Sequence, residues 1–247
     1  APDFNLGLAA RLRAAGIPTV QLVSPSVWAW RQWRIKRIAV SVDLMLVLFP
    51  FEADFYQGHD IPVRFIGHPL ADEIPIAPPD ARHARQALGL NETGPLLAIL
   101  PGSRMSEVKR LAPRFIDTCA LLQARHPGLQ CLAPLASEAG LNHVRDLQAR
   151  RAPRLPLTLL AGQSLQAMRA ADVVLMASGT ASLEAMLLKR PMVVAYRVAP
   201  STAWLLRRLI KVQHVALPNL LAGQRLVPEL LQTQATPGRL AAAVTTW

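Results

Sequence analysis

Glycine, serine and arginine follow an apolar run in the middle of the chain. Residues 96–100 read Leu-Leu-Ala-Ile-Leu, and Pro101-Gly102-Ser103-Arg104 comes next. Glycine lets the backbone approach an anion, a serine hydroxyl donates a hydrogen bond, and arginine can bind two phosphate oxygens at once. If the run is a parallel strand, the segment lies at its carboxyl end, where open α/β sheets bind ligands. This predicts a phosphate site, with an ordinary turn carrying a solvated arginine as the alternative.

A second apolar run, residues 173–177, ends in Ser178-Gly179-Thr180, and a helix is predicted over 180–189. The free backbone N–H groups and the positive dipole end of such a helix attract anions. Glu184 lies one turn further along the same face, where its carboxylate would repel a phosphate but could accept two hydrogen bonds from a ribose diol. Alternatively, Ser178 or Thr180 only caps the helix and Glu184 is a surface charge. Two such strand ends in one domain favour a nucleotide site.

Residues 24–37 hold three of the five tryptophans and four basic residues. At helical periodicity Arg31 shares a face with Ile35 and Ile38, while Trp33 and Lys36 lie broadly opposite. A cation on an apolar face predicts that Arg31 points into a cleft. The alternative is that its aliphatic part lies on the apolar face and only its guanidinium extends to water. The opposite face, aromatic and basic, would suit anionic lipid or single-stranded nucleic acid.

An amphipathic helix is predicted over residues 201–211. Leucines and an isoleucine occupy one side, and either packing into the protein or contact with a membrane surface would cover them. The other side carries an aromatic residue and three cations, which are the candidate membrane contacts: Trp204, Arg207, Arg208 and Lys211.

Apolar runs of four to six residues alternate with helix-length segments, which predicts an α/β fold with parallel sheets. A proline-rich linker is predicted at residues 74–80. It separates residues 1–73, the C-terminal portion of a first domain whose front we expect to be missing, from a second domain, 81–247, that we expect to be truncated at its end. The predicted strands are 19–23, 44–49, 63–66, 96–100, 129–133, 157–160, 173–177 and 192–196, with 214–217 as a weaker ninth. Helices are predicted over 6–15, 113–125 and 180–189, among others.

Composition excludes several classes of protein. With 51% hydrophobic and 17% charged residues in 247, the chain is neither disordered nor a small stapled scaffold. The net charge is +11, and residues 73–247 carry 20 basic and 10 acidic residues, a field that attracts phosphates. No apolar run is long enough for a membrane-spanning helix. Cys119, Cys131 and the six histidines lack metal-ligand spacing, so we expect no metal site.

The motifs together resemble the lipid A disaccharide synthases, which are inverting glycosyltransferases of the GT-B type. The match runs nearly from end to end. It rests on residues 1–5 (Ala-Pro-Asp-Phe-Asn), 23–31 (Val-Ser-Pro-Ser-Val-Trp-Ala-Trp-Arg), 65–72 (Phe-Ile-Gly-His-Pro-Leu-Ala-Asp), 100–104 (Leu-Pro-Gly-Ser-Arg), 177–184 (Ala-Ser-Gly-Thr-Ala-Ser-Leu-Glu) and 217–223 (Leu-Pro-Asn-Leu-Leu-Ala-Gly).

The resemblance implies two Rossmann-like domains and transfer of a sugar from UDP-2,3-diacylglucosamine to 2,3-diacylglucosamine 1-phosphate, a step in making the lipid A of Gram-negative bacteria. It implies no cofactor. Trp28 and Arg31 would then lie at the acceptor or cleft side of the first domain. We further expect a cytoplasmic protein, peripheral on the inner membrane, and a homodimer at full length. The residues expected to hold UDP are Gly102, Ser103, Arg104, Gly179, Thr180, Glu184 and Asn219.

The catalytic base of that family is expected at an aspartate upstream of Ala1, and Asp3, the second aspartate of the motif, is not assigned this role. We therefore expect this chain to bind UDP without catalysing transfer. Two alternatives remain at this point. Another GT-B enzyme, such as a UDP-sugar epimerase, would need acid–base residues that the sequence does not identify. A basic nucleic-acid-binding module fits the charge, but no recognisable motif supports it.

Overall fold

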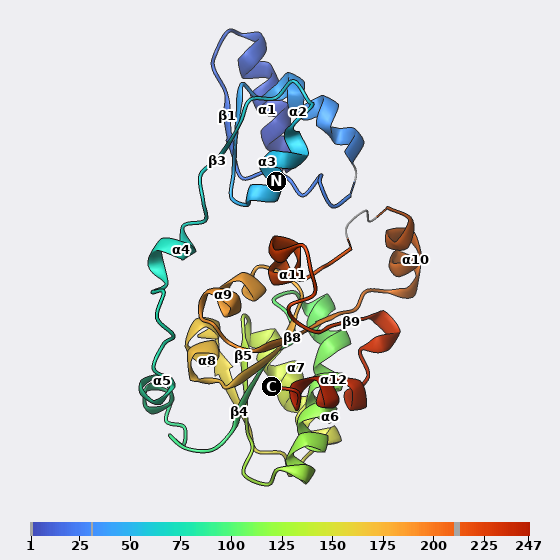
Figure 1. Cartoon of the computed structure of the whole chain (residues 1–247). Coiled ribbons are helices and arrows are strands. Elements are labelled where there is room, and N and C mark those ends of the chain that lie inside the picture. Colours follow the sequence, from blue (N-terminus) through green and yellow to red (C-terminus); the bar gives the residue numbers. More distant parts are fainter. Residues whose placement is uncertain (1, 31, 210–212) are drawn as a thin grey trace. The chain divides into compact units, whose positions relative to one another are not determined.

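The computed structural model describes residues 2–30, 32–209 and 213–247 (Figure 1). The chain divides into two compact units. Unit 1 comprises residues 1–73 with 204–213, and unit 2 comprises 74–203 with 214–247. The division after Glu73 falls where the predicted linker begins, but residues 74–80 belong to unit 2, and 204–213 group with unit 1 rather than with the second domain.

Unit 1 is built on a parallel sheet in the order β1-β2-β3, with Val20 opposite Leu44 and Met45 opposite Val63. Helices cover one face of this sheet, and Leu6, Ile38 and Met45 are among the residues fully buried between the two layers. The elements of this unit are α1 (Pro2–Ala14), β1 (Val20–Leu22), a 3₁₀ turn (Gln32–Arg34), α2 (Ile35–Ser41), β2 (Leu44–Val47), α3 (Pro50–Tyr56), β3 (Val63–Phe65) and α4 (Leu70–Glu73).

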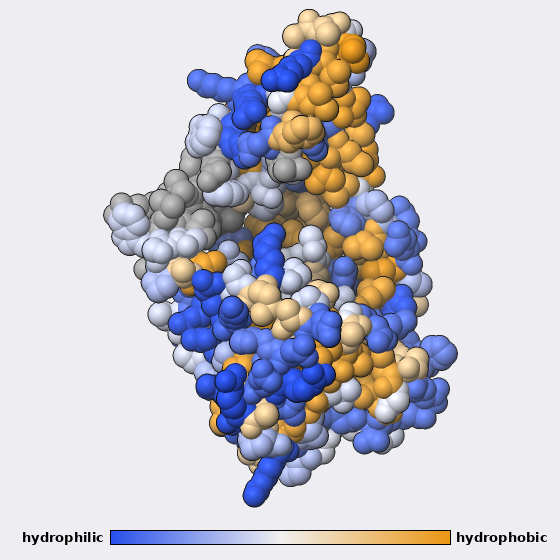
Figure 2. All heavy atoms as spheres, turned by 180° about the vertical axis from the view of Figure 1, so that it is seen from behind, coloured by the Kyte–Doolittle hydropathy of each residue, from blue (hydrophilic) through white to orange (hydrophobic). Residues whose placement is uncertain are grey.

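The sheet of unit 1 also carries exposed apolar side chains. Val20 and Leu22 of β1 are 60% and 57% exposed, and Phe65 and Ile66 at the end of β3 are about half exposed. Figure 2 shows apolar atoms gathered over part of this unit. A parallel sheet ordinarily has both faces covered. Among the described residues, the exposed side chains of β1 and β3 depart from that rule.

Unit 2 contains a parallel sheet in the order β6-β5-β4-β7-β8-β9. The chain proceeds from β4 outward to β6 on one side, then crosses back to β7 and continues outward to β9 on the other. This reversal creates a switch point between β4 and β7, where neighbouring connections diverge at the carboxyl ends of the strands. The strands are β4 (Leu96–Leu100), β5 (Gln130–Leu135), β6 (Leu157–Ala161), β7 (Val173–Ala177), β8 (Met192–Tyr196) and β9 (Glu229–Leu231).

Helices pack on both faces of this sheet. Phe115 and Leu122 of α6 lie in the larger core with residues of α7 and α12, and Ala84 and Ala167 lie in a smaller core on the other face. The sheet is thus buried between two helical layers, which confirms the predicted α/β class. The helices of unit 2 are α5 (Ala81–Ala87), α6 (Met105–Arg125), α7 (Glu138–Arg151), α8 (Ser164–Ala170), α9 (Ala181–Leu187), α11 (Leu217–Ala222) and α12 (Pro237–Val244), with a 3₁₀ turn at Gln232–Gln234. Helix α10 (Pro200–Leu209) begins in unit 2, and its residues from Trp204 onward group with unit 1.

Two sequence predictions are wrong. Residues 214–216 do not form a strand, because the carboxylate of Glu229 accepts hydrogen bonds from the backbone N–H groups of Val215 and Ala216, and helix α11 begins directly afterwards. The ninth strand is β9 instead. Helix α6 begins at Met105 rather than at Pro113, which lies inside it, because the buried face of the helix is continuous from Val108 onward.

Candidate functional site

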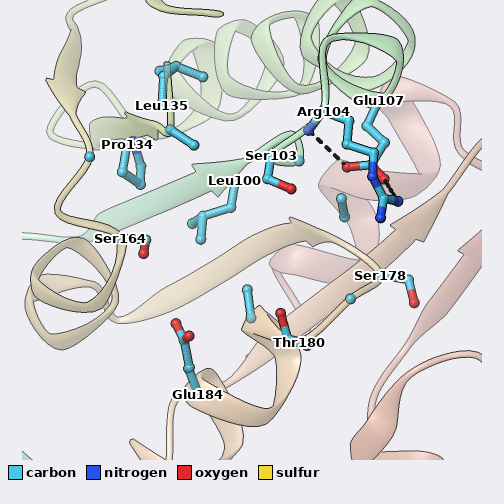
Figure 3. Close-up of a pocket in the computed structure, with 16 residues that line it drawn as sticks. Leu100, Ser103, Arg104, Glu107, Pro134, Leu135, Ser164, Ser178, Thr180 and Glu184 are labelled. Atoms are coloured by element: carbon cyan, nitrogen blue, oxygen red, sulfur yellow. Dashed lines mark hydrogen bonds and ion pairs between the residues drawn. The ribbon is translucent and has the colours of Figure 1, made fainter. Parts of the chain in front are cut away.

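A pocket of about 450 Å³ lies at the carboxyl ends of β4, β5, β6 and β7, around the switch point of unit 2 (Figure 3). Both strand ends singled out in the sequence contribute to it. Its lining residues are Leu100, Gly102, Ser103, Arg104, Glu107, Pro134, Leu135, Ala136, Gly162, Ser164, Ala177, Ser178, Gly179, Thr180, Ala181 and Glu184.

The loop after β4 forms one wall of the pocket. Gly102 has φ +119°, and a Cβ atom there would lie 2.5 Å from Oε2 of Glu107, so glycine is required by both conformation and space. Ser103 and Arg104 are exposed, and the guanidinium of Arg104 donates to Oε1 of Glu107 at 3.3 Å. The other carboxylate oxygen of Glu107 accepts from the backbone N–H of Arg104 at 3.4 Å, which caps the start of α6.

The turn between β7 and α9 forms the facing wall. Ser178 donates to the carbonyl of Val215 at 3.0 Å, and buried Ser182 donates to the carbonyl of Gly179 at 2.7 Å. These two bonds fix the turn while Gly179 and Thr180 stay exposed to the pocket. The structure therefore brings together six of the seven residues expected to hold UDP.

Glu184 stands on the α9 side of the pocket, and Figure 3 shows its carboxylate with no dashed contact to the other residues drawn. The side chain is half-buried, and this burial raises the pKa of Glu184 above its ordinary value. A carboxylate oriented into a pocket in this way is available to accept hydrogen bonds from a ligand.

Sequence analysis missed the contribution of β5 and β6 to the pocket. Gly162 and Ser164 follow β6, and Pro134 and Leu135 end β5. The signal was present, because Gly162 follows an apolar run just as Gly102 does. Glu107 was also not predicted as a pocket residue. It lies in the first turn of α6, and its side chain lines the pocket because it turns back onto the loop before that helix.

Asn219, the seventh expected residue, does not line the pocket. Its side chain is 0% exposed, and its Oδ1 accepts from the N–H groups of Leu226 and Val227 at 2.8 and 2.9 Å. Its Nδ2 donates to the carbonyl of Val227 at 3.0 Å and to Oε1 of Glu229 at 2.7 Å. Because its hydrogen-bonding groups are occupied, Asn219 holds the segment between α11 and β9 and offers no group to a ligand in this conformation.

Trp28, in unit 1, is anchored rather than free. Its Nε1 donates to Oε1 of Glu52 at 3.1 Å, and its ring meets that of Phe51 edge to face at 4.8 Å. The Glu52 carboxylate also accepts from the backbone N–H of Phe49, yet burial outweighs these bonds and raises the pKa of Glu52. Arg31, its expected companion at the acceptor side, lies outside the described residues.

The predicted alternation of buried and exposed positions is confirmed for the described residues that follow Arg31. Ile35 and Ile38 are buried, whereas Trp33 and Lys36 are exposed. Asp3 forms ion pairs with Arg34 and Arg37 across α1 and α2. The expected aromatic and basic surface is therefore made by Trp33 in the 3₁₀ turn and by Lys36 and Arg37 on the exposed side of α2.

Helix α10 matches most of the predicted amphipathic helix, and its Trp204 is 58% exposed. The side chains of Arg207 and Arg208, and all of Lys211, lie outside what the structure describes. Within residues 2–30, 32–209 and 213–247, no helix has the length and apolar character needed to cross a bilayer. Over the same described ranges, no cluster of three or more acidic, histidine or cysteine side chains could hold a metal ion.

Solved structures with a similar fold define the class to which the chain belongs. UDP-GlcNAc 2-epimerase from Neisseria meningitidis aligns with a TM-score of 0.62 at 13% identity, over 98% of this chain and 64% of the epimerase. ADP-heptose LPS heptosyltransferase II from E. coli aligns with a TM-score of 0.52 at 13% identity, over 98% of this chain and 80% of that protein. At such identity these matches show the fold alone, which is that of the GT-B glycosyltransferases.

Sequence comparison identifies the family within that class. The model of the lipid-A-disaccharide synthetase family matches residues 1–246. The lipid-A-disaccharide synthase of Chromohalobacter salexigens is 55% identical over 247 residues, and that of Pseudomonas aeruginosa PAO1 is 55% identical over 244. These matches cover 100% and 99% of this chain and 64% of each relative. The chain belongs to the lipid-A-disaccharide synthetase family, and it spans 64% of the length of these relatives.

Proposed function

We propose that this chain supplies the nucleotide-sugar site of a glycosyltransferase that joins UDP-2,3-diacylglucosamine to 2,3-diacylglucosamine 1-phosphate, releasing UDP and lipid A disaccharide 1-phosphate. The observation that carries the proposal is the pocket at the switch point of unit 2, which is lined by both the loop after β4 and the turn before α9. Membership of the family supports the choice of substrates.

The pocket offers different groups to the diphosphate and to the ribose of UDP. Ser103, Arg104 and the exposed turn at Gly179 and Thr180 provide hydrogen-bond donors for the diphosphate. Glu184 provides a carboxylate that can accept from both ribose hydroxyls. Asn219 acts indirectly in this proposal: its Nδ2 donates to the carboxylate of Glu229, which also accepts from the backbone N–H of Val215, the partner of Ser178.

Calorimetry with UDP and pyrophosphate tests these roles. UDP should bind the chain more tightly than pyrophosphate, and Glu184→Gln should weaken UDP binding more than pyrophosphate binding, because only UDP carries the ribose diol. Equal losses for the two ligands would remove Glu184 from ribose recognition. If an oligonucleotide bound more tightly than UDP, with a steep dependence on salt, the chain would instead be a nucleic-acid-binding module.

We further propose that the protein acts at the cytoplasmic face of the inner membrane, where α10 contacts anionic lipid. The exposed Trp204 and the two cations that follow it, Arg207 and Arg208, support this assignment. Each basic residue near an anionic surface contributes about 1 kcal/mol, and added salt screens that contribution.

Vesicle sedimentation tests the membrane proposal. Arg207→Ser/Arg208→Ser should reduce binding to anionic vesicles, whereas Arg145→Ser/Arg150→Ser, which removes the same charge from the exposed face of α7, should not. Equal recovery of the chain with neutral and anionic vesicles would contradict electrostatic docking.

We also propose that the full-length protein is a homodimer, which analytical ultracentrifugation would test.

A further inference from the structure

We propose that Glu107 competes with the nucleotide for Arg104: its carboxylate accepts from Nη1 of the guanidinium, and this bond must break when a diphosphate takes that donor. The inference rests on the proposed function of the pocket and adds a residue that lowers its affinity for UDP. By this proposal Glu107 is a positioning residue that weakens the hold on the released product.

The carboxylate of Glu107 contacts the loop after β4, which is the loop proposed to bind the diphosphate. Its two oxygens accept from the backbone N–H of Arg104 at 3.4 Å and from the guanidinium of the same residue at 3.3 Å. Gly102, with no Cβ atom, leaves the space that this carboxylate occupies. Figure 3 shows both contacts as dashed lines on the wall formed by Ser103 and Arg104.

The exposure of the two side chains indicates which partner moves. The Arg104 side chain is 81% exposed, whereas that of Glu107 is 24% exposed and is held by the cap of α6. Arg104 can therefore turn toward a ligand while Glu107 stays in place. A fixed negative charge in the pocket opposes the phosphates, and the Nη1 donor of Arg104 is unavailable to them until its bond to Glu107 breaks.

Tyr196 at the end of β8 provides an independent optical probe of this pair. Burial is the main cause that raises the pKa of Tyr196; the Glu107 carboxylate raises it further, and Arg104 lowers it. The chain has two tyrosines, and the other, Tyr56, is buried with its hydroxyl against Ser24. The ultraviolet titration of phenolate absorbance can thus report on Tyr196, with Tyr196→Phe to assign the signal.

Glu107→Gln is the decisive variant, because glutamine also serves at this position of a helix cap and only the charge is lost. Calorimetry should show that UDP binds about twofold to fivefold more tightly. This fold-change corresponds to the free energy of an exposed ion pair, which no longer has to break when UDP binds. The matched control is Glu92→Gln, which removes an exposed carboxylate before β4, at the end of the strand away from the pocket. It should leave UDP affinity unchanged.

A second pair of variants separates competition from simple repulsion. In an Arg104→Ala background, Glu107→Gln should give a smaller gain, since there is no guanidinium to release. The same gain in both backgrounds would overturn the proposal, because the carboxylate would then act on the phosphate directly. The pKa of Tyr196 should fall in Glu107→Gln, and an unchanged pKa would contradict the placement of the charge.

The failure of this inference can be told apart from that of the proposed function. If UDP does not bind the unmodified chain, the nucleotide site is wrong and the competition falls with it. If UDP binds and Arg104→Ala weakens binding, but Glu107→Gln leaves the affinity unchanged or lower in a folded protein, only the competition is refuted.

Discussion

Arg104→Ala should weaken UDP binding, and the structure allows the magnitude to be worked out. Arg104 is the cation among the described residues that line the pocket, its side chain is 81% exposed, and it is paired with Glu107 at 3.3 Å. A hydrogen bond to a charged partner contributes about 1.5–3 kcal/mol. Breaking an exposed ion pair costs about 0–1 kcal/mol, which must be subtracted. The net loss is about 0.5–3 kcal/mol, or about a 2- to 150-fold increase in the Kd for UDP.

Isothermal calorimetry of the unmodified chain and the variant measures this change directly. Circular dichroism and thermal unfolding should first show that the variant is folded, which we expect because the side chain is 81% exposed and its ion pair with Glu107 lies at the surface. Lys109→Ala is the matched control: it removes one exposed cation from the first turns of the same helix, α6, without touching the pocket lining.

Two results would refute the reasoning. An unchanged Kd in folded Arg104→Ala would remove this side chain from the site. An equal loss in Lys109→Ala would show that UDP senses the positive field of unit 2 as a whole rather than a contact with Arg104.

Three further predictions concern stability. Gly102→Ala should destabilise the chain by about 1–3 kcal/mol and lower UDP affinity, because alanine is strained at φ +119° and its Cβ would collide with Glu107; wild-type stability in urea denaturation would contradict this. Asn219→Ala should cost about 3 kcal/mol or more in the same assay, since it leaves the buried N–H of Val227 and the part-buried N–H of Leu226 unpaired. Because burial raises the pKa of Glu184, the folded state loses stability as pH rises through the interval between its unfolded and folded pKa. Glu184→Gln should accordingly be more stable than wild type at neutral pH, with the difference shrinking as pH falls through that interval; a constant difference across pH would count against it.

Secondary structure was most predictable where burial is complete. The bounds predicted for β4, β7 and β8 match the structure, because a parallel strand covered on both faces is a continuous apolar run. The edge strand β9 was missed, since it is three residues long and opens with Glu229, whose side chain turns back to α11. The start of α6 was misplaced because Pro113 is normally a helix start, and only the packing of the earlier turn shows otherwise.

The sequence by itself determined the fold class, the family and the local chemistry of the two strand ends. Both glycine motifs can be recognised without a structure, because each consists of a few consecutive residues. They are Gly102 with Arg104 after β4, and Gly179 before the helix that carries Glu184. Only the tertiary structure decided which groups face the pocket. It brought β5 and β6 into the site and turned Glu107 back onto the loop. It also placed Asn219 in the interior, with every side-chain hydrogen-bonding group occupied. The physical reason is that backbone conformation is set mainly by neighbours in the chain, whereas the partner of a polar side chain is set by the segments that packing brings beside it.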